Sequence, residues 1–260
     1  MKIPFVKAHG ARNDFLLTWA HEAPPAARLA EAALVLCDRH SGVGADGWLL
    51  VQPPSANKPA AIRLFNPDGG EVEISGNGTR CAAAFLVDSD LAGFEIRIQT
   101  GAGLKELRLL GRDGLRFLFE MNMNAPQLLS LDGGPDGGTT LYVGNPQCAV
   151  FVESFDFDWA RRGAEIERDP MFPQRTNVSF VKVVDEHTLD VRFFERGAGV
   201  TESSGTGSTG AVAAAILRGL AKSPLTVRTV AGPLAFRWET EDIYMQGPAE
   251  IVAGGEFYFG

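Results

Sequence analysis

Residues Phe65–Leu86 read F-N-P-D-G-G-E-V-E-I-S-G-N-G-T-R-C-A-A-A-F-L, and this stretch decides the fold. An apolar strand ends in the N-P-D-G-G turn, a short segment follows, and Ser75-Gly76-Asn77-Gly78 opens an apolar helix. Serine is a favoured N-cap residue, because its hydroxyl accepts a hydrogen bond from a backbone N–H of the first turn. The chain repeats the pattern where Ser204-Gly205-Thr206-Gly207 opens a second small-residue helix, Ala211 to Leu217. Two matching helix starts predict two matching half-sites.

The composition predicts two domains and a small polar ligand. With 260 residues, 45% of them hydrophobic, the chain can bury two ordinary cores. The net charge is −8 and the Lys and Arg residues are scattered, which argues against nucleic acid as a partner. The sequence shows neither a signal-peptide pattern nor a run of about 20 apolar residues, the length that spans a membrane. We therefore expect a cytoplasmic protein without a membrane partner.

The cysteines and histidines give no sign of a disulfide framework or a metal site. Cys37, Cys81 and Cys148 are an odd number without a C-x-x-C pair, which suits a reducing compartment, and we expect all three to be buried small side chains. The four histidines are far apart in sequence and none has H-x-x-x-H spacing. The sequence therefore predicts a site without a metal.

The order of elements predicts an α+β fold with two domains. Short strands with Gly-containing connections dominate the first half, with a helix over residues 26–36, and the pattern strand, turn, short strand, S-G-x-G and helix recurs in the second half, with a helix over 159–168. Residues 122–138 are rich in Asn, Pro, Gly and Asp, as expected of a domain crossing. We predict one domain over residues 1–122, a second over 123–250, and a final strand over 251–260 that returns to the first domain.

The paired S-G-x-G sites could bind an anion or stabilise one that develops during a reaction. A helix N-terminus carries unpaired N–H groups and about half a positive charge, so two facing ones could bind a carboxylate and the carbanion beside it. The alternative is two ordinary capped helices whose glycines allow close packing. No Lys follows the glycines, which disfavours a nucleotide phosphate loop. Polar residues at strand ends and turns resemble a pocket for a zwitterion: Asn66, Asn145, Asn177, Glu195 and Arg196.

Six motifs in order resemble those of the diaminopimelate epimerase family. They are G-A-R-N-D-F, R-H-S-G-V-G-A-D-G, F-N-P-D-G-G-E-V-E-I-S-G-N-G-T-R-C, G-N-P-Q-C, R-T-N-V-S-F and E-R-G-A-G-V-T-E-S-S-G-T-G-S. The resemblance implies two pseudo-symmetric domains, similar to proline racemase, each with a mixed or antiparallel sheet wrapped around a central helix. It also implies a homodimer that needs neither pyridoxal phosphate nor another cofactor and interconverts LL- and meso-diaminopimelate, a zwitterionic amino acid, in lysine biosynthesis.

The same resemblance assigns the binding residues. The distal amino-acid end of the substrate would be held by Asn13, Asn66, Asn145, Asn177, Glu195 and Arg196. The carboxylate at the reacting carbon would be held by the backbone amides of Gly76, Asn77, Gly205 and Thr206.

The proton-transfer positions depart from the family pattern. The family uses two cysteines, one as a thiolate base and one as a thiol acid; Ser75 and Ser204 stand there, and Gln147 replaces the family's histidine. A serine hydroxyl is far less acidic than a thiol of pKa about 8.5, and a helix dipole worth about 1 kcal/mol cannot ionise it at neutral pH. Glu195, which partners the second cysteine in the family, is a candidate base for Ser204. Cys81 lies on another face of its helix and is no substitute.

Three functions follow from this departure. The protein interconverts the diaminopimelate isomers, or it binds an amino acid without inverting it, or it is a one-base isomerase of another small carboxylate with Glu195 as the base. An engineered pair of Cys-to-Ser changes would have left the histidine in place. Gln147 and the Glu202-Ser203 pair therefore favour natural divergence over engineering.

Overall fold

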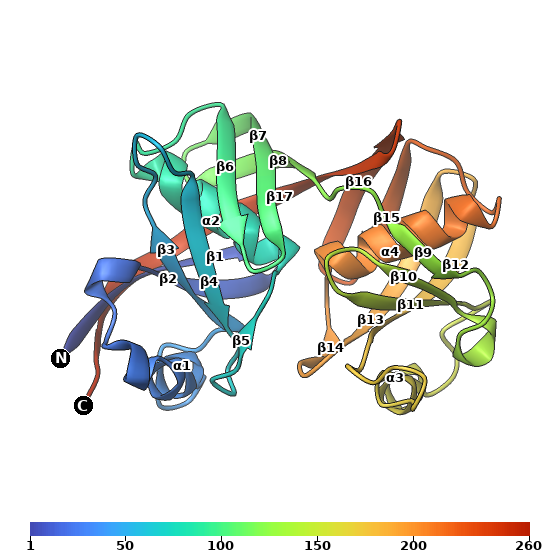
Figure 1. Cartoon of the computed structure of the whole chain (residues 1–260), viewed down its shortest axis with the longest axis horizontal. Coiled ribbons are helices and arrows are strands. Elements are labelled where there is room, and N and C mark those ends of the chain that lie inside the picture. The colour runs from blue at the N-terminus through green and yellow to red at the C-terminus, as the bar shows by residue number, and fades with distance from the viewer. The chain divides into compact units, whose positions relative to one another are not determined.

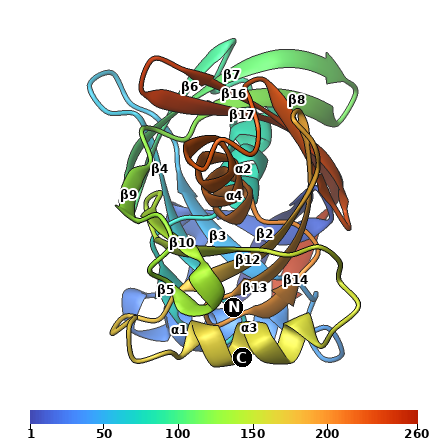
Figure 2. The same ribbon diagram turned by 90° about the vertical axis from the view of Figure 1, so that its right-hand side faces the viewer.

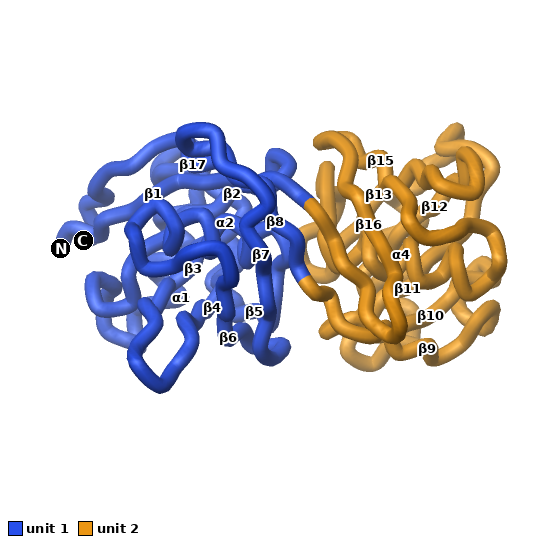
Figure 3. The backbone as a smooth tube through the Cα atoms, turned by 90° about the horizontal axis from the view of Figure 1, so that it is seen from above, with its two compact units in different colours: residues 1–121, 247–260 blue, residues 122–246 orange.

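The computed structural model describes all 260 residues, which form two compact units (Figure 3). Unit 1 comprises residues 1–121 and 247–260, and unit 2 comprises residues 122–246. The predicted domains ended at residues 122 and 250, and the units change at 121 and 246. No helix in the structure has the length and apolar character needed to cross a membrane.

Unit 1 has an inner helix, an outer helix and a strongly curved sheet. Its elements are β1 (Lys2–Gly10), β2 (Asn13–Trp19), η1 (Ala20–Glu22), η2 (Ala26–Arg28), α1 (Leu29–Cys37), β3 (Gly47–Gln52), β4 (Ala60–Phe65), β5 (Glu71–Val72), α2 (Gly76–Asp88), β6 (Glu95–Thr100), β7 (Gly103–Asp113) and β8 (Arg116–Asn122). The helix predicted from residue 26 begins instead at Leu29, because residues 26–28 form a separate 3₁₀ turn.

The strands of unit 1 close into a barrel around α2. The strands β1, β2, β3, β4, β6, β7 and β8 pair in this order, and β17 (Asp242–Tyr258) pairs with both β8 and β1. Helix α2 lies among these strands in Figure 1, and all its residues from Gly76 to Val87 are buried. This burial explains the A-A-A-F-L run, because a helix that is enclosed on every side must be apolar or small all round.

Unit 2 repeats these elements. They are β9 (Gln127–Ser130), η3 (Pro135–Gly137), β10 (Thr139–Tyr142), β11 (Pro146–Phe151), α3 (Trp159–Glu167), β12 (Asn177–Asp185), β13 (Thr188–Glu195), β14 (Gly199–Thr201), α4 (Gly205–Leu217), β15 (Leu225–Thr229) and β16 (Gly232–Glu239). In Figure 2, α4 lies inside the strands of unit 2 and α3 lies outside them. Helix α4 begins at Gly205, directly after its serine.

The two units have the same topology, strand for strand. The pairs β1–β2, β2–β3, β3–β4, β4–β5, β4–β6 and β6–β7 are matched in direction by β10–β11, β11–β12, β12–β13, β13–β14, β13–β15 and β15–β16. The parallel pairs are β2–β3 and β4–β6 in unit 1 and their equivalents β11–β12 and β13–β15 in unit 2, and the other pairs are antiparallel. The predicted α+β class with two pseudo-symmetric domains, each wrapped around a central helix, is confirmed.

Each outer helix fills the crossover between two parallel strands. Helix α1 packs Leu29, Ala33 and Leu36 against Trp48 and other side chains of the outer core of unit 1. Helix α3 contributes Ile166 to a similar cluster on β11 and β12. The first strands of each unit are therefore covered on both faces, which accounts for continuous apolar runs such as G-W-L-L-V in β3.

The chain crosses between the units twice. After β8, Met123 N–H donates to Ile243 O and Ile243 N–H donates to Asn124 O, and β9 then pairs with β10. In the other direction, β17 is a single strand that pairs with β16 in unit 2 and with β1 in unit 1, from Lys2↔Tyr258 to His9↔Glu250. The strand β9 lies in the stretch assigned to the domain crossing, where the sequence predicted no strand.

Candidate functional site

Helix α2 begins with Ser75 as its N-cap. The backbone of Ser75 is extended, with φ −129° and ψ 126°, and its Oγ accepts a hydrogen bond of 3.1 Å from Gly78 N–H. The Ser75 carbonyl receives Thr79 N–H at 2.8 Å. Gly76 N–H has no acceptor in the chain, and the residue is buried. This is the arrangement that binds a carboxylate at a helix N-terminus.

Helix α4 repeats this start. Ser204 has φ −139° and ψ 122°, and its Oγ accepts a 3.1 Å bond from Gly207 N–H. The backbone N–H groups of Gly205 and Thr206 have no acceptor in the chain. Ser204 is only 3% exposed, whereas Ser75 is partly exposed. The two helix starts are alike in hydrogen bonding and differ in access to solvent.

Asn13 joins the start of α2 to the edge of β2. Asn77 Nδ2 donates to Asn13 Oδ1 at 3.2 Å, and Asn13 Nδ2 donates to Asp46 Oδ2 at 2.8 Å. The buried Arg80 donates to Asn77 Oδ1 at 2.5 Å and to Pro248 O at 3.1 Å. Two predicted ligands, Asn13 and Asn77, therefore lie together beside Ser75.

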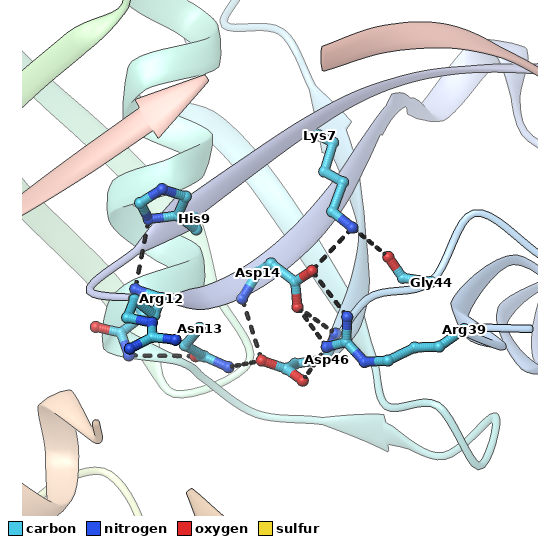
Figure 4. A network of polar contacts seen from close by, with 9 residues as sticks. Lys7, His9, Arg12, Asn13, Asp14, Arg39, Gly44 and Asp46 are labelled. Atoms are coloured by element: carbon cyan, nitrogen blue, oxygen red, sulfur yellow. Dashed lines mark hydrogen bonds and ion pairs between the residues drawn. The ribbon is translucent and has the colours of Figure 1, made fainter. Parts of the chain in front are cut away.

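An ionic network supports Asn13 from outside (Figure 4). Arg39 donates to Asp14 and to Asp46, each at 2.7 Å, and Lys7 Nζ lies 2.9 Å from Asp14. Partial burial alone would raise the pKa of Asp14, but hydrogen bonds and charge from Arg39 and Lys7 outweigh it and lower the pKa to about 2. Asp14 is therefore a carboxylate throughout the physiological range.

The turn before Asn13 is conformationally unusual. Gly10 pairs with Asn13, and the two residues between them, Ala11 and Arg12, have φ of 49° and 64°. Two successive left-handed residues form the tight hairpin turn that matches the twist of paired strands, but glycine or asparagine normally occupies such positions. Arg12 N–H donates to His9 Nδ1 at 3.4 Å. The hairpin fixes where β2 starts and therefore where Asn13 stands.

Asn145 has the equivalent place in unit 2, but its amide is turned round. Each asparagine lies two residues before the first residue of β2 or β11 that pairs with the parallel neighbour. Asn145 Nδ2 donates to Thr206 Oγ1 at 3.4 Å, and Asn145 Oδ1 accepts from Gln147 Nε2 at 2.6 Å. Gln147 Oε1 is buried without a partner. In unit 1 the carbonyl of Asn13 faces the helix, whereas in unit 2 the amino group of Asn145 does.

Asn66 and Glu195 are equivalent residues of the two units. Each begins the tight turn that leads into β5 or β14, and each of these strands ends three residues before a capping serine. The side-chain amide of Asn66 has no hydrogen-bond partner. Glu195 Oε1 accepts a 2.6 Å bond from Thr201 Oγ1. Ser204 Oγ accepts Gly207 N–H, which leaves the hydroxyl proton available, so the role of Glu195 as the base for Ser204 stays a prediction.

Asn177 and Arg196 lie together at the ends of β12 and β13. Asn177 Nδ2 donates to Pro146 O at 2.9 Å, and Asn177 Oδ1 accepts from Arg196 N–H at 3.0 Å. Both ends of this amide therefore hold the scaffold together, although each retains one further hydrogen-bonding position. The buried Glu167 accepts Gly197 N–H at 3.3 Å and is ion-paired with Arg175. Glu167 thus braces the turn that carries Glu195 and Arg196.

The native cysteines stand apart from this chemistry. Cys37, Cys81 and Cys148 are all buried, as the sequence predicted. Burial raises the pKa of each thiol to about 12, only partly opposed at Cys81 by the charge of Arg80. None is a thiolate near neutral pH. No three side chains among the His, Cys, Asp and Glu residues lie close enough together to hold a metal ion.

Comparisons with known proteins identify the family of this chain. The sequence model of the diaminopimelate epimerase family matches residues 5–129 and 139–252. The chain belongs to the diaminopimelate epimerase family. Diaminopimelate epimerase from Pelotomaculum thermopropionicum is 39% identical over 277 residues, covering 97% of this chain and 98% of the relative. The Synechococcus elongatus enzyme of the same name is also 39% identical, covering 98% of each chain.

Solved structures of two other proteins share the fold. A hydroxyproline epimerase from Agrobacterium vitis, with bound trans-4-hydroxy-L-proline, superposes with a TM-score of 0.77 at 17% identity, covering 98% of this chain and 92% of the other. A probable proline racemase from Agrobacterium radiobacter gives 0.78 at 18% identity, covering 97% and 92%. Within the diaminopimelate epimerase family, then, this chain keeps the scaffold and carries hydroxyls at both predicted proton-transfer positions.

The sequence did not identify the residues that hold the predicted ligands in place. Asp46, Arg80 and Glu167 each bond to a predicted ligand or to the turn that carries one. Asp46 and Arg80 stand inside quoted motifs, R-H-S-G-V-G-A-D-G and S-G-N-G-T-R-C, so a charged residue within a motif was the available signal. Glu167 lies in no motif, and only the fold reveals it.

Proposed function

We propose that this protein binds LL- and meso-diaminopimelate and interconverts them without a cofactor, in the route to lysine. The full-length similarity to diaminopimelate epimerases carries this proposal. The predicted binding residues support it, since asparagines, a carboxylate, an arginine and two helix N-termini together suit a zwitterion with carboxylate ends. We also propose a cytoplasmic homodimer.

The backbone amides would hold the reacting carboxylate. Gly76, Gly205 and Thr206 offer N–H groups that have no acceptor in the chain. Such donors stabilise charge that develops on the carboxylate as the neighbouring carbon loses its proton, and so they make that proton more acidic. Ser75 and Ser204 would be the two proton-transfer groups. A neutral hydroxyl can donate a proton to the carbanion, but it is a weak acceptor, so inversion should be much slower than with thiols.

A second function is favoured by the state of the two serines. Each Oγ already accepts a backbone N–H as an N-cap, and neither is hydrogen-bonded to a side-chain base. A hydroxyl held in this way stabilises the start of its helix. The alternative is therefore a protein that binds diaminopimelate, or a similar amino acid, and does not invert it. A one-base isomerase with Glu195 as the base has less support, because Thr201 occupies one oxygen of that carboxylate.

One pair of measurements separates these functions. Calorimetry with LL-diaminopimelate measures binding, and proton NMR in D₂O follows loss of the α-proton and appearance of the meso isomer. Binding with exchange and inversion supports the first proposal, and binding without exchange supports the second. Exchange at one stereocentre without inversion would indicate one-base chemistry. No binding at millimolar ligand would reject diaminopimelate as the ligand.

The double variant Ser75→Ala with Ser204→Ala is the matched control. It removes both hydroxyls and leaves the backbone amides in place. If the serines transfer protons, exchange should disappear while binding persists. Exchange that survives in this variant would come from another group or from a contaminating enzyme, and would contradict the roles given to the two serines.

A further inference from the structure

Asn13 and Asn77 belong to a chain of hydrogen bonds that runs in one direction. Arg80 Nη2 donates to Asn77 Oδ1 at 2.5 Å, Asn77 Nδ2 to Asn13 Oδ1 at 3.2 Å, and Asn13 Nδ2 to Asp46 Oδ2 at 2.8 Å. The chain thus begins at a buried guanidinium and ends at a carboxylate. Figure 4 shows the Asp46 end of it.

The charged ends decide how both amides are turned. A guanidinium has no acceptor and a carboxylate has no donor, so only one orientation of each asparagine satisfies both neighbours. Reversing Asn13 would set its carbonyl against Asp46 and its amino group against that of Asn77, and both bonds would be lost. After these bonds, Asn13 retains one N–H and one lone pair, whose directions are fixed by the orientation.

Asp46 is itself held rigidly. Arg39 Nη2 donates to Asp46 Oδ1 at 2.7 Å, and Asp14 N–H donates to Asp46 Oδ2 at 3.1 Å. The backbone N–H of Asp46 donates to Asp14 O at 2.9 Å. The oxygen that receives Asn13 therefore cannot drift, because bonds from a second strand and from an arginine fix the carboxylate.

Unit 2 shows what happens without these charged ends. Thr176, directly before β12, takes the place of Asp46, and Thr209 takes the place of Arg80, five residues after the capping serine. There the equivalent Asn145 turns its amino group toward the helix residue Thr206. The same scaffold thus holds asparagine amides of opposite orientation, and the difference follows the two end residues, one of which can only donate and the other only accept.

We propose that Asp46 is a positioning residue that sets the amide orientation of Asn13, and so the donor that Asn13 presents to an amino-acid ligand. The inference rests on the proposed function, because that function makes Asn13 a ligand-binding residue. Asp46 does not touch the ligand in this proposal and acts through Asn13 alone. What matters is its acceptor oxygen and not its charge.

Two substitutions separate the acceptor from the charge. Asp46→Asn keeps a carbonyl that can receive both Asn13 Nδ2 and Asp14 N–H, if its amino group turns toward Arg39, whose side chain is 53% exposed and keeps its bonds to Asp14. Asp46→Ala removes the acceptor as well. Glu31→Ala is the control, because it breaks an exposed ion pair between Glu31 of α1 and Arg28 of η2 and leaves Asn13 untouched.

Calorimetry with LL-diaminopimelate should show Asp46→Ala binding about tenfold more weakly, the loss expected for one hydrogen bond, and Asp46→Asn within about twofold of the unchanged protein. The Asn13 side-chain amide signals in ¹H–¹⁵N NMR should shift and exchange faster in Asp46→Ala only. Equal losses in both variants would mean that charge is what matters, and would overturn the proposal, as would no loss in either.

The two proposals fail in different ways. If the unchanged protein does not bind diaminopimelate, the proposed function is rejected. The Asn13 amide signals are measured without ligand, so they still decide whether Asp46 orients that amide. Signals that are the same in the unchanged protein and in Asp46→Ala would overturn the positioning role whatever the ligand is.

Discussion

Placing a thiol at position 75 tests the chemistry of the α2 N-terminus directly. Ser75→Cys puts sulfur where Gly78 N–H now donates to the serine hydroxyl at 3.1 Å. The matched control is Ser89→Cys, because Ser89 is the C-cap of the same helix. The two variants sample opposite ends of one helix and should therefore differ in the sign of the dipole that each thiol meets.

The expected difference in thiol pKa can be worked out from these contacts. The reference value is about 8.5, and a helix end contributes about 0.3–1 kcal/mol, or roughly 0.2–0.7 of a pKa unit. A hydrogen bond from Gly78 N–H to a thiolate adds about 1.5–3 kcal/mol, or roughly 1–2 units, and partial burial of position 75 opposes some of this. We expect a pKa of about 7 at position 75 and about 9 at position 89.

Alkylation by iodoacetamide as a function of pH measures both values. The native thiols give little background, since Cys37, Cys81 and Cys148 are buried and burial holds the pKa of each at about 12. The unchanged protein is the blank. An inflection for Ser75→Cys equal to or higher than that for Ser89→Cys would refute the argument that this helix start stabilises an anion.

Three further changes test other parts of the structure. Thr240→Gly should raise the free energy of unfolding by about 1 kcal/mol in urea titration, because Thr240 is β-branched and has φ 54° in the β16–β17 turn. Glu167→Gln should lower it by about 2 kcal/mol and weaken ligand binding, because the bonds to Arg175 and the turn at Gly197 lose a charge. The pKa of Asp14 is about 2 in the folded protein and about 3.9 in an unfolded chain. Ionised Asp14 therefore contributes to the free energy of unfolding above about pH 4, and this contribution is lost as the pH falls toward 2. Asp14→Asn should therefore flatten the loss of stability in that window, measured by thermal melts.

The sequence predicted the features that depend on local chemistry. Both inner helices begin directly after their serines, at Gly76 and Gly205. These starts could be predicted because a capping residue, small residues and an apolar run all lie within a few positions of each other. The same holds for α3, predicted over residues 159–168 and found over Trp159–Glu167. Local signals of this kind are enough to set the start and type of an element.

The sequence could not predict how the side chains share their hydrogen bonds. Asn177 is predicted to bind a ligand, and its amide also joins residues 31 and 19 positions away in the chain, which the sequence did not indicate. The bond from Asn13 to Asp46 spans 33 positions. Such bonds depend on register and on parallel pairing, which no local pattern fixes.

The strand β9 was missed for a related reason. Gln127–Ser130 is four residues long, mostly exposed, and surrounded by Asn, Pro, Gly and Asp, so its composition is typical of a loop. It is a strand because β10 offers an edge for it to pair with. Context, and not propensity, decides the conformation of such a short segment.

The passage of β17 from one unit to the other has a consequence for biosynthesis. Residues 247–260 leave the ribosome after the whole of unit 2, yet they pair with β1, which leaves it before unit 2. Until they emerge, unit 1 has an unpaired edge at β1, although most of its sequence has long been available. Domains usually fold in the order in which they are made. Here the first half of the protein can be completed only after the second half has been synthesised.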